Sequence, residues 1–197
     1  MDACWWRRSK RFWLNTDMEE IALHILDLVQ NCVEAGASEV SIAITECRRD
    51  NLLRIMISDN GRGMDQATLV AVTDPFFTTR STRKVGLGIP LLKAAAEQCN
   101  GSFIIESSEG KGTQVVASFA LDHIDRAPLG SMADTLAAVF AVHHVDVHYL
   151  HDVDGKVFML DSKEIRQLCG DELRHPRVIV WLRAYIEEHE KQVRGEQ

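Results

Sequence analysis

The 197-residue sequence has little of what several large protein classes require. Its five cysteines are an odd number, widely spaced and without a CxxC pair, which argues against a disulfide framework or a zinc ribbon and favours a reducing cytoplasm. No apolar run approaches the roughly 20 residues of a membrane-spanning helix, and the first residues lack the apolar core of a secretion signal. We therefore expect a cytoplasmic protein with no membrane partner.

The sequence also lacks an excess of basic over acidic residues. Residues 1–121 hold 13 Lys and Arg against 15 Asp and Glu, and residues 122–197 hold 9 against 14, so the net charge is -7. Neither half is the basic platform that nucleic acids require, and we expect no nucleic-acid partner. The hydrophobic content of 46% is ordinary for a globular chain, and the length allows one core plus an extension.

The first 17 residues form a separate N-terminal arm in our prediction. The arm mixes cations with large aromatic side chains, and two interpretations stay open: it packs on its own domain or on a dimer mate, or it binds a membrane surface or an acidic partner. The residues concerned are Trp5, Trp6, Arg7, Arg8, Lys10, Arg11, Phe12 and Trp13.

Hydrophobic periodicity predicts helices and strands in an order typical of one layer of helices on a mostly antiparallel sheet. The helices are predicted at residues 19–34, 65–72 and 87–99, and the strands at residues 40–44, 52–58, 102–107 and 113–121. After Asp122 the composition shifts. A helix at 129–142, a hairpin turned at Asp154-Gly155 and two final helices then predict a second unit or a long extension over residues 122–197.

The first predicted helix carries two candidate site residues. Asp27 and Asn31 are four residues apart and so lie one turn apart on the same face. An amide oxygen suits a hard cation such as Mg²⁺, and a carboxylate one turn earlier can hold a water as a general base. Such a pair on its own is more often two solvated polar residues, so the spacing leaves both interpretations open.

The stretch Asp59-Asn60-Gly61-Arg62-Gly63 follows the second predicted strand. An acid at a strand end can accept a hydrogen bond from an exocyclic amine of a purine, and the glycines allow the backbone to approach a flat ligand. Asp-Asn-Gly is also ordinary turn chemistry, so a plain turn remains the alternative.

Gly86-Leu87-Gly88 stands at the start of the helix predicted at 87–99. Free N–H groups and the positive end of a helix dipole suit an anionic phosphate. The basic, hydroxyl-rich stretch before it predicts a lid with charge-assisted contacts, for which the candidates are Thr79, Arg80 and Lys84. The sequence has no GxxxxGK[ST], and no GxGxxG after a strand, so neither a P-loop NTPase nor a dinucleotide fold is indicated.

The order of these motifs, completed by Gly110-Lys111-Gly112-Thr113, resembles the GHKL superfamily of ATP-binding domains over residues 18–121. That superfamily includes gyrase-type topoisomerases, heat-shock chaperones, sensor histidine kinases and MutL-type mismatch-repair ATPases. Residues 27–37 are similar to the MutL-type helix, whereas residues 74–80 and 85–89 are similar to histidine kinases.

The resemblance implies the α+β fold class: a two-layer α/β sandwich of the Bergerat type, followed here by a C-terminal α/β extension. It also implies ATP and Mg²⁺ as cofactors. Asn31 would then bind the metal, Asp59 would contact the adenine amino group, Gly63 would flank the base with Gly61 nearby, and Thr113 would assist adenine recognition.

The phosphates would face Gly86 and Gly88, and Asp27 would occupy the place of the base that orients water or activates a hydroxyl. That place usually holds Glu in the ATPases, so the shorter Asp27 predicts slow hydrolysis. Lys84 stands near the position of the first lid glycine of the kinases. About twenty residues precede the domain, so we expect neither a dimerising helix pair nor a phospho-acceptor histidine, and His24 is a poor substitute.

The resulting hypothesis is an ATP·Mg²⁺-binding regulatory protein that acts as a stand-alone protein kinase or slow ATPase on a protein partner or substrate. The alternative is a non-catalytic switch in which ATP changes only the affinity for a partner. A homodimer stays open. A histidine group near the predicted hairpin allows a metal site as the minor alternative to ordinary surface histidines, and its members are His143, His144, His148 and His151.

Overall fold

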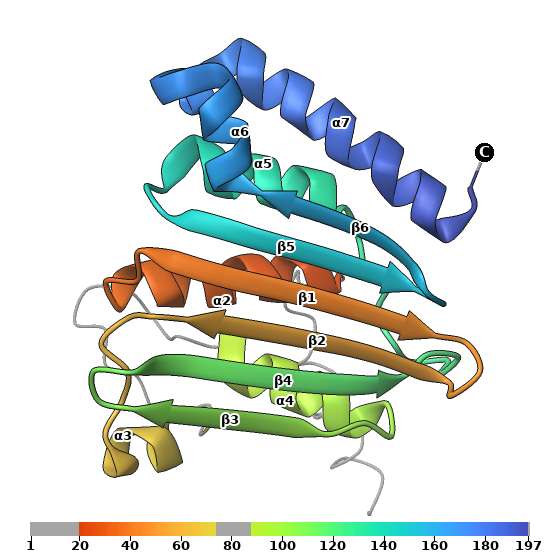
Figure 1. Cartoon of the computed structure of the whole chain (residues 1–197). Coiled ribbons are helices and arrows are strands. Elements are labelled where there is room, and N and C mark those ends of the chain that lie inside the picture. The colour runs from red at the N-terminus through yellow and green to blue at the C-terminus, as the bar shows by residue number, and fades with distance from the viewer. Residues whose placement is uncertain (1–19, 74–87, 197) are drawn as a thin grey trace, which may run out of the picture.

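The computed structural model describes residues 20–73 and 88–196. Its centre is one six-stranded sheet with the strand order β3-β4-β2-β1-β5-β6 (Figure 1). The strands are β1 (Glu39–Cys47), β2 (Leu52–Asp59), β3 (Phe103–Ser108), β4 (Gly112–Ala120), β5 (Asp146–Val153) and β6 (Lys156–Asp161).

The sheet is antiparallel except where β5 pairs in parallel with β1. Through this pairing the described part of residues 122–197 extends the same sheet and shares its hydrophobic core. The predicted mostly antiparallel sheet is therefore confirmed. The predicted division at residues 17 and 121 stays a prediction, and the N-terminal arm lies outside the described residues.

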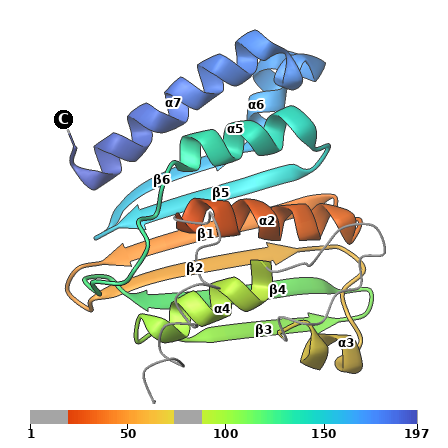
Figure 2. The ribbon, with the colours of Figure 1, turned by 180° about the vertical axis from the view of Figure 1, so that it is seen from behind.

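Helices cover one face of the sheet, as Figure 2 shows from behind for α2, α4, α5 and α7. The predicted α+β two-layer sandwich is confirmed. The helices are α2 (Ile21–Glu34), α3 (Gln66–Ala71), α4 (Gly88–Gln98), α5 (Met132–Val142), α6 (Ser162–Cys169) and α7 (Pro176–Arg194), with a 3₁₀ turn at Gly170–Arg174.

Strand alternation explains the two layers. In β1 the side chains of Val40, Ile42 and Ile44 are buried, and the residues between them are not. Because successive side chains of a strand point to opposite faces, this alternation directs one apolar face toward the helices. Each fully buried Ile contributes about 1.5–3 kcal/mol relative to an exposed one, so the buried face decides which side the helices cover.

Helix α5 begins three residues later than periodicity predicted. Gly130 has a φ of +81°, which a right-handed helix does not allow, and the next residue, Ser131, accepts a hydrogen bond from the Asp134 N–H at 3.1 Å. This side-chain cap satisfies one of the N–H groups left open at a helix start. The local turn chemistry therefore sets the helix start.

A buried polar network joins the sheet to α7. His151 is fully buried on β5, with Nδ1 2.8 Å from Glu190 Oε2 and Nε2 3.1 Å from Glu46 Oε1. Tyr149 donates its hydroxyl to Glu190 at 2.8 Å, and Arg194 donates to the same carboxylate at 3.2 Å. Carboxylates at both ring nitrogens favour the doubly protonated imidazolium, which donates to each of them.

The network shifts the protonation equilibria of its members. Burial alone lowers the pKa of His151, but the hydrogen bonds to Glu190 and Glu46 outweigh burial and raise this pKa above its ordinary value of 6.5. The hydrogen bond to His151 lowers the pKa of Glu46 against the opposing effect of burial. The charged forms of both partners are thus favoured in the folded protein.

None of the helices in the described ranges is both long enough and apolar enough to cross a membrane. The four cysteines of those ranges, Cys32, Cys47, Cys99 and Cys169, are free thiols.

The raised pKa of His151 predicts a pH-dependent stability. Because the folded pKa lies above the unfolded one, the stabilisation is complete below about pH 6.5 and is lost as the pH rises through the folded pKa. We expect His151→Gln to lower the free energy of unfolding by about 3 kcal/mol at pH 6, since it removes the buried cation that the two carboxylates share. Urea titrations followed by circular dichroism at several pH values measure the free energy of unfolding of the wild type and the variant. The difference between these two free energies should shrink as the pH rises. A constant difference would contradict the assignment.

Candidate functional site

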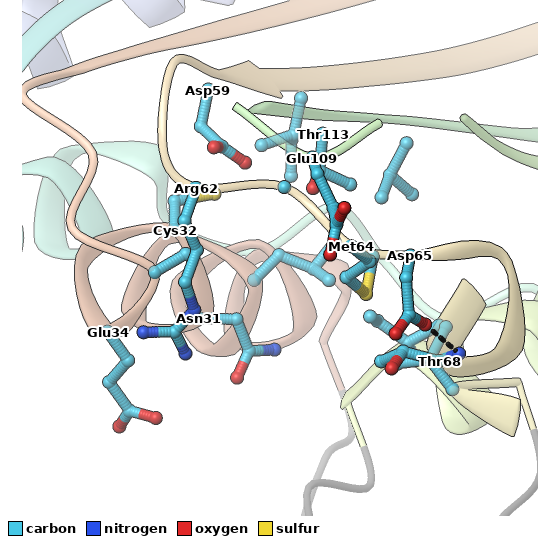
Figure 3. Close-up of a pocket in the computed structure, with 17 residues that line it drawn as sticks. Asn31, Cys32, Glu34, Asp59, Arg62, Met64, Asp65, Thr68, Glu109 and Thr113 are labelled. Atoms are coloured by element: carbon cyan, nitrogen blue, oxygen red, sulfur yellow. Dashed lines mark hydrogen bonds between the residues drawn. The ribbon is translucent and has the colours of Figure 1, made fainter. Parts of the chain in front are cut away.

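A cavity of about 640 Å³ opens between α2, the end of β2 and the turn between β3 and β4 (Figure 3). Its walls combine apolar side chains such as Leu28, Ile57 and Val115 with the polar groups of Asn31 and Asp59. Cavities of about 300–1,000 Å³ with mostly apolar walls and a few polar groups are the usual form of small-molecule sites. The cavity therefore has the size and lining of a ligand site.

Asp59 and Thr113 face the cavity from neighbouring strands. They are register partners in the β2–β4 pair, and the Gly61 N–H donates to Asp59 Oδ1 at 2.7 Å. This backbone donor fixes one carboxylate oxygen and leaves the other for a ligand. The structure thus brings Asp59 and Thr113 together at one wall of the cavity, and their roles toward adenine stay predictions.

Gly61 and Gly63 shape the loop after β2 by close approach. A Cβ on Gly61 would lie 3.0 Å from the Ala35 carbonyl oxygen, and Gly63 has a φ of +65° with its Cβ position only 2.0 Å from the Ser108 carbonyl oxygen. Side chains are excluded at both points, so the loop can lie against α2 on one side and the β3–β4 turn on the other.

Ser107 connects the two loops beside the cavity. Its hydroxyl accepts from the Met64 N–H at 2.9 Å, donates to the Gly112 carbonyl at 2.9 Å and lies 2.9 Å from the Thr113 hydroxyl. The Gly110 N–H adds a bond to the Arg62 carbonyl at 2.7 Å. These bonds hold the loop after β2 and the β3–β4 turn in one arrangement.

Asn60 joins the same loop to the start of β1. Its Oδ1 accepts from the N–H groups of Ser38 and Glu39 at 2.9 and 3.0 Å, and its amide donates to the Ser38 hydroxyl. The Asn60 side chain is therefore a structural brace. Its neighbour Asp59 is the side chain that faces the cavity.

Asp27 lies against the first residue of α4. A Cβ built on Gly88 would lie 1.8 Å from Asp27 Oδ2, so only glycine allows this approach. Asn31 follows Asp27 one turn later on α2 and lines the cavity. The structure thus brings Asp27, Asn31 and Gly88 to one side of the site, at the N-terminal end of α4.

The remaining predicted site residues fall in the lid stretch, which lies outside the described residues. They are Thr79, Arg80, Lys84, Gly86 and Leu87.

The cavity is also lined by side chains that the motifs did not single out as ligand contacts, among them Cys32, Arg62, Met64 and Glu109. In Figure 3 Arg62 extends on the Asn31 side, and Glu109 reaches in from the β3–β4 turn toward Met64. The apolar spacing of α2 accounts for the burial of Cys32, but it gives no sign that the same residue also borders the cavity. Arg62 and Glu109 stand in loops, where no spacing rule reveals the direction of a side chain.

Burial, followed by the nearby Asp59 carboxylate, raises the pKa of the Cys32 thiol. A neutral thiol beside Asp59 is a packing group and a weak donor.

The predicted histidine group is dispersed. His148 lies between Glu39 and Asp161 at 3.2 and 2.9 Å, His151 is buried in the network described above, and His144 contacts Arg174. Within the described part of the chain no cluster of three or more His, Cys, Asp and Glu side chains is placed to hold a metal ion.

The residues fit an adenine nucleotide with a divalent cation. A carboxylate acceptor and a hydroxyl stand together at one side, an amide oxygen lines the cavity on α2, and the start of an 11-residue helix faces Asp27. A helix start favours phosphate, and Mg²⁺ commonly takes one or two protein oxygens together with phosphate and water.

The fold and the cavity define a class, a nucleotide-binding α/β sandwich. The profile of the family described as "Histidine kinase-, DNA gyrase B-, and HSP90-like ATPase" matches residues 16–123, more than half of the chain. The chain belongs to this family of ATP-binding domains.

Relatives of known name are sensor kinases. Over 110 residues the chain is 38% identical to the sensor protein kinase FleS of Pseudomonas aeruginosa, covering 56% of this chain and 27% of FleS. Over 101 residues it is 31% identical to the sensor histidine kinase ZraS of Klebsiella oxytoca, covering 50% of this chain and 21% of ZraS. The chain thus spans only about a fifth to just over a quarter of the length of these relatives.

The fold resembles a crystal structure of the N-terminal domain of a DNA repair protein. The TM-score is 0.53 at 15% identity, and the match covers 78% of this chain and 57% of that chain. At this identity the likeness concerns the fold alone.

The tight approach at Gly63 predicts a steep cost for any side chain there. Gly63→Ala should lower the free energy of unfolding by about 3 kcal/mol or more, because it adds a collision with the Ser108 carbonyl to the cost of a left-handed backbone. Gly110→Ala is the matched control, since Gly110 also has a positive φ but has no atom within 4 Å of its Cβ position. Gly110→Ala should lower the free energy of unfolding by only about 1–2 kcal/mol. Equal losses in urea titrations of the two variants would contradict the geometry.

Proposed function

We propose that this protein binds ATP with Mg²⁺ in the cavity between α2 and the loop after β2, and acts as a regulatory protein kinase or slow ATPase. The observation that carries the proposal is the position of Asp27, whose carboxylate lies against Gly88 at the start of α4, one helical turn from Asn31. The names of the relatives support a regulatory kinase role.

Base recognition falls to Asp59 and Thr113. The carboxylate of Asp59 accepts a hydrogen bond from the exocyclic amine, while its other oxygen stays bonded to the Gly61 N–H. Apolar walls at Ile57 and Val115 exclude water from the faces of the ring. A purine without the amine leaves the carboxylate unpaired and should bind less tightly.

Phosphate binding falls to the opposite side of the cavity. The N-terminal end of α4 presents its N–H groups and the positive end of the helix dipole. Asn31 supplies an amide oxygen for the cation, which when bound neutralises phosphate charge. The chain's own contribution is to hold these groups within one helical turn of Asp27.

Asp27 acts as the general base in this proposal. It accepts the proton of the attacking water in hydrolysis, or of a hydroxyl or imidazole of a protein substrate in phosphotransfer. Its side chain is one methylene shorter than Glu, so the base stands farther from the nucleophile and turnover is slow. If the protein turns over no ATP at all, it is a non-catalytic switch in which the bound nucleotide changes the affinity for a protein partner.

The role of Asp59 predicts loss of discrimination between adenine and hypoxanthine. Asp59→Asn should weaken ATP binding about 10- to 100-fold, because a charge-assisted hydrogen bond is removed. Inosine triphosphate lacks the 6-amino group, so its affinity should change far less. Isothermal titration calorimetry of both nucleotides with the wild type and the variant measures how far the effect of the substitution depends on the 6-amino group. An equal loss for the two nucleotides would show that Asp59 does not contact the amine.

The role of Asp27 predicts a separation of binding from turnover. Asp27→Asn keeps the shape beside Gly88 and should bind ATP·Mg²⁺ with near wild-type affinity while phosphate release or transfer falls about 100-fold or more. Labelled γ-phosphate distinguishes release to water from transfer to a second protein in a cell extract. Asp27→Glu, with its longer reach, serves as the control and should keep or raise turnover. Unchanged turnover in Asp27→Asn would remove the assignment.

A further inference from the structure

Helix α7 is held on two sides. Toward α5, Arg183 Nε lies 2.5 Å from Asp134 Oδ1, and Leu182 and Ile186 are fully buried. Toward β6, the rings of Tyr185 and His189 pack against Phe158, with centroid distances of 6.1 and 5.0 Å. The helix therefore lies above the edge of the sheet, with α5 on its inner side (Figure 2).

The side of α7 that faces away from α5 carries four exposed residues at spacings of four, three and four: Arg177, Trp181, Ala184 and Glu188. These spacings place all four on one helical stripe. Trp181 is 52% exposed and stacks on Tyr185 at a centroid distance of 5.3 Å, so the stripe adjoins the aromatic side chains above β6. We call these four residues the α7 stripe.

Below the stripe runs the open edge of β6. The two-residue turn pairs Val153 with Lys156, and alternation from this pair points the backbone N–H and C=O groups of Val157 and Met159 away from β5. Among the described residues no backbone partner meets these groups. The side chains of Val157 and Met159 are 49% and 69% exposed, which is unusual for an unprotected edge.

We propose that the β6 edge and the α7 stripe together form the interface of a two-fold homodimer. The stripe is complementary to itself: in an antiparallel pair of α7 helices, Arg177 meets Glu188 of the second copy and Trp181 meets Ala184 of the second copy. Every contact of the stripe then pairs either two opposite charges or a large side chain with a small one. Arg177 has no ion-pair partner within the described residues, which leaves its charge for this contact.

The two parts of the interface have compatible spacings. Paired edge strands lie about 4.8 Å apart, and packed helices lie about 8–10 Å apart. Helix α7 packs on Phe158 and so lies almost above the edge strand β6. When two β6 strands pair, the two α7 helices therefore come next to each other. The result is one continuous sheet with both α7 helices side by side on it.

The nucleotide cavity stays open in this dimer. It lies at α2, β2 and β4, whereas β6 is the last strand at the far side of β1 and β5 (Figure 1). The interface is therefore independent of nucleotide binding, and variants in it should leave ATP affinity unchanged.

A charge exchange tests the proposal in the full chain. Sedimentation velocity over a range of protein concentrations should show a monomer–dimer equilibrium. Arg177→Glu and Glu188→Arg should each raise the dimer dissociation constant about tenfold or more, since two ion pairs become two like-charge contacts. The double variant Arg177→Glu/Glu188→Arg should restore the wild-type constant, because it rebuilds both pairs with reversed sign.

Two further variants separate the interface from general effects. Arg54→Glu changes the net charge as much as Arg177→Glu does but lies exposed on β2, which β1 and β5 separate from β6, and it should not weaken the dimer. Met159→Pro removes an outward N–H of β6, a position where an edge strand tolerates proline, and should abolish dimerisation while the thermal transition is kept. A monomer at every concentration, or a dimer that both Arg177→Glu and Met159→Pro leave unchanged, would overturn the proposal.

Discussion

The packing of α2 on the middle of the sheet is the constraint on which the site depends. Ile25, Leu28 and Val29 are buried against the strands, and this apolar face fixes the rotation of the helix about its axis. With 3.6 residues per turn, a change of one residue in that packing would turn the helix by about 100°. Asp27 would then leave Gly88, and Asn31 would leave the cavity. The core thus holds the polar residues of the site in place.

Strand register is the second constraint. Asp59 stands opposite Thr113 because β2 and β4 pair over their whole length with one buried face each. A slip of one residue would send every apolar side chain of a strand to the other face, so the core resists it strongly. Ser107 and the close approach at Gly63 then join the loops at the strand ends. The cavity is the space that these fixed ends leave.

Much of this arrangement could be predicted from local pattern. The helix at α2, the alternating strands β1 and β2, and the order of the acidic and glycine motifs depend on periodicity and turn chemistry, which neighbouring residues determine. Arg62 and Glu109 could not be predicted as cavity residues, because their role depends on loops that meet only in the folded chain. The separation of His148 from His151, by contrast, follows from strand alternation, since residues three apart on β5 point to opposite faces.

The sequence by itself determined the helices, the strands, the family-typical order of motifs and the identity of the polar groups, since each of these follows from residues close together in the chain. Only the tertiary structure decided that β5 would join β1 in parallel, that His151 would meet Glu46 and Glu190, and that α7 would lie above the edge of β6. Contacts between residues 39 and 105 positions apart depend on which buried faces fit together, and that fit is a property of the whole core.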